Sequence, residues 1–280
     1  TSIVNPYDRI NRKVRLDQWL ELPTEQTDAL LAAAIRAENR TTPAHSWRIT
    51  EPVVHAFGIF QTFRDRYGCN AADFAAFIDQ LGIYGRGETL SQFDQVFNSQ
   101  GGYGESLKLD NGTFAISPVP GSPDLTARQL CHGLQIDPQT YEYLARAVGG
   151  ARGVTTNLTR DAQTVSSFYR LVKLPRLLGI TPIEGVLMLL SLGGNTWLNG
   201  LAGETRINSA TDSESPPDVL DLMYAMHSCV AWCRERELPV QWVLQQVALT
   251  EAVVVHTAKE QQLSEQIHNL LPTAQLTNAA

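Results

Sequence analysis

The sequence predicts a mainly α protein, an irregular multi-helix bundle that carries one inserted β-hairpin. Apolar residues recur at helical spacing through most of the 280 residues. Proline and a capping side chain stand together at several corners, where a proline can occupy the first helical turn without losing a hydrogen bond. One Asn-Gly dipeptide lies between short apolar alternations, and this pattern is typical of a hairpin turn.

The N-terminal part is predicted to contain at least three helices. Thr24 begins a segment whose apolar residues fall on one face and whose acidic residues lie near its positive end. Asn70 is expected to cap a helix over residues 71–81, because apolar side chains recur there at intervals of three and four. Gly82 is placed to end that helix. Ser91 is predicted to cap a short third helix.

Residues 106–117, SLKLDNGTFAIS, form the one predicted β element. Asn111 and Gly112 can supply the two positive-φ residues of a type I′ turn. Leu109 would then face Phe114 across the hairpin. Since a lone hairpin is marginally stable in water, its apolar face is expected to pack on the helices or on a partner.

The junction at residues 177–190, LLGITPIEGVLMLL, is predicted to be architectural. Gly179 can end one helix in the left-handed conformation. Thr181 can cap the next helix, with Pro182 at its first position and Glu184 completing a capping box. Every polar or special residue of the junction therefore has a structural task.

The helix after this junction is apolar nearly all round, which predicts a central position. Gly185 inside it costs about 1 kcal/mol relative to alanine, and a neighbouring backbone in close approach is the usual compensation. Asp137 is expected to cap a similar corner. Four corners of this type are unevenly spaced, which excludes a fixed-period solenoid. Their prolines are Pro23, Pro138, Pro182 and Pro239.

The C-terminal third is also predicted to be helical. Asp218 follows two prolines and opens a helix with an apolar stripe that ends at Cys233. Residues 241–271 are predicted to be mainly helical as well. Residues 208–218 are polar and rich in serine and proline, which is typical of a mobile loop.

Composition argues against several classes of protein. The net charge is −7, and the 18 arginines and 4 lysines form no basic tract, which argues against nucleic-acid binding. Apolar runs such as residues 186–190 are far shorter than the roughly 20 residues of a transmembrane helix. No signal peptide is visible. The charged fraction of 18% is below the roughly 25% of a typical soluble domain, which suits a surface that is partly covered.

No metal, cofactor or catalytic residue is predicted. His227 lies roughly 200° around a helix from Cys229, so these residues do not form a metal site together with Cys233. We expect both cysteines to pack as small hydrophobes and all four cysteines to be reduced. Cys69 is explained by a hydrophobic staple at the helix start. The glycines of residues 82–88 lack the spacing and the lysine of a phosphate loop, and other catalytic signatures are missing. The chain is therefore not expected to be an enzyme.

Five histidines are expected at the surface, where they could titrate near neutral pH, and a pH-sensing role stays open for them. They are His45, His55, His132, His256 and His268.

The order of these motifs resembles the A component of the bacterial insecticidal toxin complexes (Tc toxins), in the region that it shares with plasmid-borne virulence protein A. The resemblance rests on LDQWLELPTEQTDALLAAAI, DFAAFIDQLGIYGRGETLSQFDQVFNSQ with its S-x-F-D-x-x-F-N core, LCHGLQIDPQTYEYLARAV, and SFYRLVKLPRLLGITPIEGVLMLLSLGG. These motifs span most of residues 16–270.

The resemblance implies a fragment of a very large, pentameric, secreted subunit that binds target cells and injects a toxic enzyme carried by other components. It implies that this region belongs to the α-helical shell around the translocation channel and carries no catalysis. The implied partners are other parts of the same subunit, neighbouring protomers and a host cell-surface receptor. Neither nucleic acid nor membrane is an expected partner of this segment.

Two other interpretations stay open. The chain could be a stand-alone virulence-associated module that grips a host protein with its hairpin and the loops of residues 99–123. It could also be an enzyme whose site is built from dispersed residues. In all three cases the chain divides into a helical part at 1–98, the excursion at 99–123 and a second helical part at 124–280, as one continuous helical unit.

Overall fold

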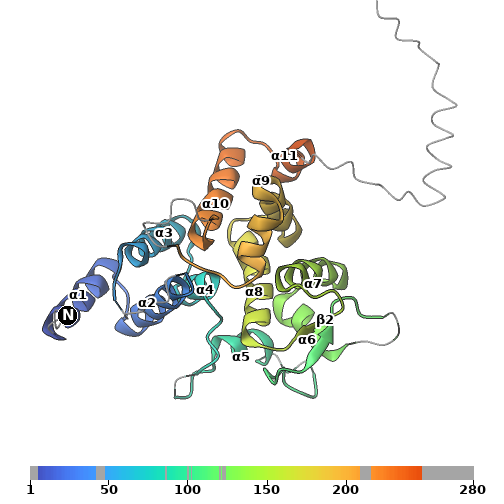
Figure 1. Cartoon of the computed structure of the whole chain (residues 1–280), viewed down its shortest axis with the longest axis horizontal. Helices are drawn as coiled ribbons and strands as arrows, with labels where there is room; N and C mark the ends of the chain where they lie inside the picture. Colours follow the sequence, from blue (N-terminus) through green and yellow to red (C-terminus); the bar gives the residue numbers. More distant parts are fainter. Residues whose placement is uncertain are drawn as a thin grey trace, which may run out of the picture. The chain divides into compact units, whose positions relative to one another are not determined.

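The computed structural model describes residues 6–41, 48–85, 87–99, 103–119, 124–208 and 216–247, together with Gly101 and Gly121. These residues form eleven helices and one two-stranded antiparallel sheet (Figure 1). The predicted fold class, mainly α with a small antiparallel β element, is confirmed.

Five helices, α1 to α5, precede the first strand in the described chain. The N-terminal helices are α1 (Pro6–Leu20), α2 (Thr24–Asn39), α3 (Glu51–Tyr67), α4 (Ala71–Ile78) and α5 (Gln92–Phe97). The middle of the chain contains β1 (Thr113–Ala115), α6 (Leu125–Leu134), α7 (Pro138–Arg152) and β2 (Asn157–Thr159). The remaining helices are α8 (Ala162–Leu177), α9 (Pro182–Ala202), α10 (Val219–Glu235) and α11 (Val240–Val247).

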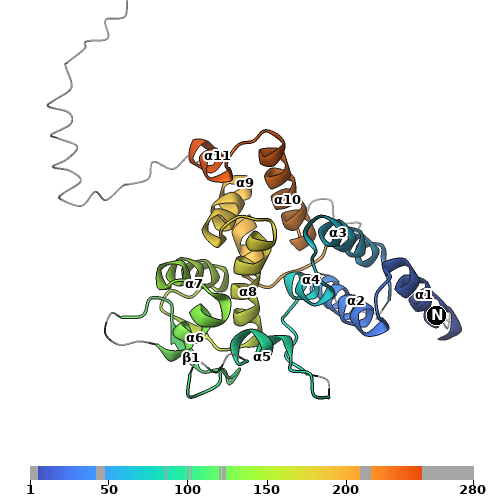
Figure 2. The same ribbon diagram turned by 180° about the vertical axis from the view of Figure 1, so that it is seen from behind.

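Helix α8 occupies the middle of the described part of the chain. It packs against α4, α7 and α9, and α9 in turn packs against α7 and α10 (Figures 1 and 2). Helix α4 packs mainly against α2, so α4 and α8 connect the N-terminal helices with the C-terminal ones. Residues up to Gln246 form one compact unit. The predicted boundaries at residues 98 and 123 are not tested by this grouping and stay a prediction.

The core is rich in aromatic side chains from α3, α4 and α8. Phe60 and Phe74 meet edge to face, with ring centroids 5.3 Å apart. Tyr141 of α7 stacks on Phe168 of α8 at 5.6 Å. Both pairs lie in the interior, where all four rings are at most 1% exposed.

Most of the predicted helix caps are confirmed. Each capping side chain accepts a hydrogen bond from a backbone N–H of the first helical turn; the residues are Asn70, Ser91, Asp137, Thr181 and Asp218. The Thr181–Glu184 capping box is present in full. At the start of α2 the cap position is Pro23, which has no side-chain bond, and the Thr24 hydroxyl donates to Asp17 instead.

Helix α4 ends earlier than predicted. The apolar spacing predicted a helix through residue 81 that Gly82 would end, but α4 stops at Ile78, and Asp79 leaves the helical conformation at φ −139°, ψ −107°. The Asp79 carboxylate binds Arg40, and the carbonyls of residues 79 and 78 accept from Arg170 of α8 and from Thr205 after α9, respectively. Tertiary hydrogen bonds therefore override the local periodicity.

The predicted local hairpin is wrong in its pairing. Strand β1 pairs antiparallel with β2, and Phe114 lies opposite Leu158 rather than Leu109. Asn111 has a positive φ of 60°, but Gly112 is not in the left-handed region, so the turn is not type I′. The apolar contact of β1 is with a strand that the sequence did not reveal, because β2 contains only three residues.

Helix α9 is less central than its apolar sequence predicted. Its outer face leaves Ile183, Leu187 and Leu192 between 37% and 39% exposed. Gly193 and Gly194 break the helix, with φ/ψ of −161°/22° and 63°/−152°.

The close neighbour of Gly185 in α9 is a side chain, not a backbone. A Cβ atom at this glycine would lie 2.4 Å from Cγ of Pro175 in α8. A close approach at Gly185 was therefore predicted correctly, but the neighbour is a proline side chain and not the predicted backbone.

Among the described helices, none is long and apolar enough by itself to span a membrane; α8 and α9 meet the criterion only as a pair, and they are bent by 95° to each other. Several predictions fall outside the described residues. These are the helix beyond residue 247, most of the loop at 208–218, and His45, His256 and His268. His55 and His132 are exposed, as predicted.

Candidate functional site

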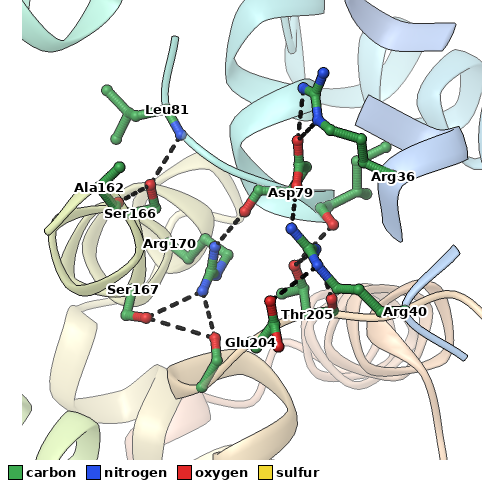
Figure 3. Close-up of polar contacts among 12 residues, drawn as sticks. Arg36, Arg40, Asp79, Leu81, Ala162, Ser166, Ser167, Arg170, Glu204 and Thr205 are labelled. Carbon is green, nitrogen blue, oxygen red and sulfur yellow. Dashed lines mark hydrogen bonds and ion pairs between the residues drawn. The ribbon is translucent and has the colours of Figure 1, made fainter. Parts of the chain in front are cut away.

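The most elaborate polar arrangement in the described chain surrounds Arg170, in the middle of α8. Its side chain is completely buried. Nη1 donates to the carbonyl of Asp79 at 2.7 Å, Nε to that of Leu201 at 3.0 Å, and Nη2 to that of Gly203 at 2.6 Å. Nη2 also donates to Ser167 Oγ at 3.1 Å. The guanidinium therefore connects α8 with the ends of α4 and α9 (Figure 3).

The acceptors explain how a cation can be buried here without a carboxylate bonded to it. Asp79 follows the last residue of α4, and Leu201 and Gly203 lie at the end of α9. The C-terminal ends of helices carry partial negative charge and unpaired carbonyl groups. Burial lowers the pKa of Arg170 to about 9, with the charge of Arg40 acting in the same direction. The side chain is still protonated at neutral pH and can donate all of these bonds.

The Asp79 carboxylate forms the second half of this arrangement. Its side chain is 1% exposed and lies between Arg36 and Arg40 of α2 (Figure 3). Nε and Nη2 of Arg36 contact Oδ2 at 2.7 and 2.6 Å, and Nη2 of Arg40 binds Oδ1. Arg40 continues to the Thr205 carbonyl at 2.7 Å, and the Thr205 hydroxyl donates to the Ile78 carbonyl at 2.8 Å.

We refer to Arg36, Arg40, Asp79, Arg170 and Thr205 as the Arg170 network. Its members join α2, α4 and α8 to the segment after α9. The hydrogen bonds described above engage the charged groups of Asp79 and Arg170 with other parts of the fold. Such an arrangement fixes the relative positions of helices, because removing one partner leaves buried polar groups unpaired.

A second buried polar group is His227 of α10. Nδ1 lies 2.6 Å from the Tyr67 hydroxyl, and Nε2 lies 3.2 Å from Arg66 Nη1. Because arginine can only donate, Nε2 accepts and Nδ1 carries the proton. Burial, and after it the charges of Arg66 and Arg234, lower the pKa of His227. The ring is therefore neutral at neutral pH, and both of its nitrogens are engaged.

The predicted apolar role of the cysteines agrees with their surroundings. Cys69 and Cys233 are buried, and burial raises the pKa of the Cys69 thiol to about 12. Cys131 is half-buried, and burial raises its pKa to about 11. A thiol with such a pKa is protonated at neutral pH and is a poor nucleophile. Within the described residues, no group of three metal-ligating side chains lies close enough together to hold an ion.

Two surface cavities differ in the charge of the residues that line them. The first, of about 500 Å³, has a wall formed by Tyr103, Arg128 and His132, and Tyr141 and Cys131 contribute to its lining. Arg128 lies over the Tyr103 ring at 5.5 Å, and His132 meets the same ring edge to face. Acidic side chains also border this cavity, so its rim has both signs of charge.

The second cavity, of about 350 Å³, lies between α1 and α2 and is completed by the residues just before α3. Leu31, Ile35 and Ile49 contribute its apolar lining, and its charged residues are mainly cationic. We call this cavity the α1–α2 groove.

Sequence analysis missed the Arg170 network, although one signal was available. Ser166, Ser167 and Arg170 recur at intervals of three and four, next to the apolar residues Val165, Phe168 and Leu171. This polar stripe indicates a buried polar contact. Asp79 gave no such signal, because its role depends on two arginines more than 35 residues away in the sequence.

The helical arrangement is shared with solved structures of much longer chains. The chain superposes on the cryo-EM structure of Yersinia pseudotuberculosis TcaA-TcaB with a TM-score of 0.62 and 18% identity, covering 94% of this chain and 13% of that one. It superposes on Morganella morganii TcdA4 with a TM-score of 0.62 and 15% identity, covering 94% of this chain and 10% of that one. At these identities the likeness shows the fold. No protein-family model matches the chain.

A sequence match links the chain to a toxin subunit. The chain is 28% identical over 251 residues to the toxin subunit YenA1 of Yersinia entomophaga. The match covers 89% of this chain and 21% of YenA1, so the chain spans about a fifth of the length of this relative. The chain is thus related to the A-type subunits of the Tc toxins and corresponds to one segment of them, as the sequence motifs predicted.

Proposed function

We propose that this chain is a non-catalytic packing segment of the α-helical shell of a Tc toxin A subunit. The Arg170 network is the observation that carries the proposal. Its charged groups hold helix ends together, and the described bonds of Arg170 go to backbone carbonyls and to Ser167. A rigid helical unit of this kind suits a shell, in which each segment must keep its shape under its neighbours.

Exposed apolar side chains support a role in packing. Ile183 and Leu187 lie one turn apart on α9, at 37% and 39% exposure. Tyr7, Ile10 and Val14 share one face of α1 and are 78%, 60% and 46% exposed. Apolar surface arranged in stripes at helical spacing is typical of a helix that contacts another element.

The proposed partners follow from the relationship to Tc toxin subunits. They are other parts of the same subunit and neighbouring protomers of a secreted pentamer. Contact with a host receptor belongs to the whole toxin and is not assigned to particular residues of this chain.

A segment exchange tests the proposal. The matching segment of YenA1 is replaced by this chain, and the size of the purified particle is measured by mass photometry and electron microscopy. The chimera is expected to form particles of the same size as unmodified YenA1, because a packing segment contributes shape. A chimera that carries Arg170→Met serves as the control and is expected to lose assembly, since its segment no longer holds its helices together.

A separate experiment tests whether the segment takes part in catalysis. Cys131→Ser and His132→Gln remove a thiol and an imidazole from the larger cavity, and both variants are expected to leave insect-cell killing by an assembled chimera unchanged. Loss of killing by a chimera that still assembles and still binds cells would contradict the proposal and favour an enzymatic role.

A further inference from the structure

Two Asn-Gly dipeptides occur in the sequence, at residues 111–112 and 199–200. In such a dipeptide the asparagine side chain can lose ammonia without an enzyme. The backbone nitrogen of the glycine attacks Cγ of the asparagine, and a five-membered imide forms as ammonia leaves. Water then opens the imide to aspartate or to isoaspartate. Glycine favours the reaction, because it has no side chain to hinder the attack.

Helix α9 holds the second dipeptide, although the Asn199 side chain is exposed. The Asn199 carbonyl accepts a hydrogen bond from the Gly203 N–H at 2.8 Å. Gly200 faces α10, since a Cβ atom there would lie 2.8 Å from Cδ1 of Leu222. Closure of the imide ring would require the backbone at Asn199 to leave the helical conformation, which breaks helical hydrogen bonds. The helix therefore protects this asparagine.

The first dipeptide lies in an exposed turn that precedes β1. Asn111 has a φ of 60°, in the left-handed region that asparagine adopts more readily than most residues. Its N–H donates to the Arg160 carbonyl at 3.2 Å, and the Arg160 N–H donates to the Gly112 carbonyl at 2.7 Å. No helical turn has to break when the Gly112 nitrogen approaches Cγ of Asn111.

A carboxylate restrains the attacking nitrogen in this turn. The Gly112 N–H donates to Oδ1 of Asp110 at 2.9 Å, and Oδ2 of Asp110 accepts from Nη2 of Arg160 at 3.0 Å. The hydrogen bond from Gly112, and after it the charge of Arg160, lower the pKa of Asp110, so its carboxylate is ionised at neutral pH. The amide nitrogen must lose its proton to attack, and a negative charge bonded to that N–H opposes the loss.

We propose that Asn111 is a site of spontaneous deamidation in the folded chain, that Asp110 slows the reaction, and that α9 protects Asn199. The bond from Cγ of Asn111 to the Gly112 nitrogen forms while the bond from Cγ to Nδ2 breaks. Overall the reaction consumes one water and releases one ammonia. The product has a carboxylate at residue 111, and in the isoaspartate form the main chain before β1 is longer by one methylene group. This inference does not depend on the proposed packing function.

Timed incubation of the purified chain at mildly alkaline pH tests the proposal. One sample is kept in buffer and another in urea, and both are digested at acidic pH so that little further deamidation occurs. Mass spectrometry of the peptides is expected to show the amide-to-carboxyl mass change at Asn111, but not at Asn199, for the sample in buffer. Both asparagines are expected to react at similar rates in urea, because neither the turn nor the helix persists there.

Asp110→Ala tests the role of the carboxylate. It removes the acceptor of the Gly112 N–H and leaves the Arg160 cation, which favours a deprotonated nitrogen. Deamidation of Asn111 in buffer is expected to become roughly threefold to tenfold faster, as expected for the loss of one exposed hydrogen bond. Asp65→Ala removes the same charge from an exposed position on α3 and is the matched control, for which no change is expected. Circular dichroism verifies that both variants are folded.

Three outcomes would overturn the proposal in whole or in part. Asn199 could react as fast as Asn111 in buffer, which would show that the helix gives no protection. Asn111 could stay intact in buffer while it reacts in urea, which would show that the turn prevents the reaction. An Asp110→Ala variant that reacts no faster than the unmodified chain would contradict the role given to the carboxylate.

Discussion

Arginine has opposite surroundings in two regions of this chain. In the Arg170 network, a guanidinium with no exposed surface bonds to helix-end carbonyls, and Arg36 and Arg40 enclose a buried carboxylate. In the α1–α2 groove, Arg9 and Arg48 are exposed beside an apolar floor and have no acidic partner in the described residues. The same residue type therefore has two roles. An arginine that is buried among hydrogen-bond acceptors stabilises the fold, whereas an exposed arginine without an acceptor does not.

The largest effect is expected from breaking the Arg170 network at its centre. Arg170→Met keeps much of the side-chain volume but leaves the carbonyls of Asp79, Leu201 and Gly203 without their donor. We expect a loss of about 3–5 kcal/mol in the free energy of unfolding, measured by urea denaturation. Arg146→Met, at an exposed pair within α7, is the control and should change stability by less than about 0.5 kcal/mol.

Asp79→Asn tests the carboxylate half of the same network. The amide keeps the shape but removes the charge that Arg36 and Arg40 share. Because both arginines retain some contact with water, the expected loss is smaller, about 2 kcal/mol in urea unfolding. Unchanged stability would show that the ion pairs contribute little to holding α2 against α4.

The Gly185→Ala substitution tests how closely α8 and α9 pack through apolar contacts. The new methyl group would overlap the Pro175 ring, so a net loss of about 1 kcal/mol is expected in spite of the better helix propensity of alanine. Gly150→Ala on α7 is the matched control, because no atom lies within 4 Å of its Cβ position. The free energy of unfolding of the Gly150→Ala variant should rise by up to about 1 kcal/mol.

Acidification should weaken the buried His227 contact. The pKa of His227 is lowered in the folded chain, so the unfolded chain takes up a proton first as the pH falls below the usual value near 6.5. Stability is therefore expected to decrease from pH 7.5 toward the lowered pKa. Urea unfolding across this range should show a shallower decrease in His227→Gln.

The smallest effect on folding is expected at the groove. Arg9→Gln combined with Arg48→Gln should change the free energy of unfolding by less than about 0.5 kcal/mol, because neither side chain is buried or paired in the described structure. A loss of several kcal/mol would mean that these arginines belong to the fold and would remove the contrast between the two regions.

Local features of this fold were predictable because their causes are local. The caps at Asn70, Asp137 and Thr181 depend on a side chain and on backbone groups two or three residues away. The mainly α class follows from the spacing of apolar residues, which persists over whole helices.

Features that depend on distant residues were not predictable from local patterns. Strand β1 pairs with β2, where Leu158 lies more than 40 residues after Phe114, and not with the residues before the Asn111 turn. Helix α4 ended at Ile78 because its last carbonyls bind groups from α8 and from the segment after α9. The candidate sites follow the same rule, since both the Arg170 network and the groove combine residues from several helices.

The central claim is that the buried charges of the Arg170 network hold the helices of this segment together, whereas the exposed arginines of the groove do not contribute to folding. It is tested most directly in the YenA1 chimera, by comparing Arg170→Met with the Arg9→Gln and Arg48→Gln double variant. Limited proteolysis would report folding of the segment, and mass photometry would report assembly. The account predicts that the first variant is cleaved within the segment and fails to assemble, and that the second resists cleavage like the unmodified chimera. An Arg170→Met segment as resistant to protease as the original, or a groove variant cleaved as readily as Arg170→Met, would contradict it.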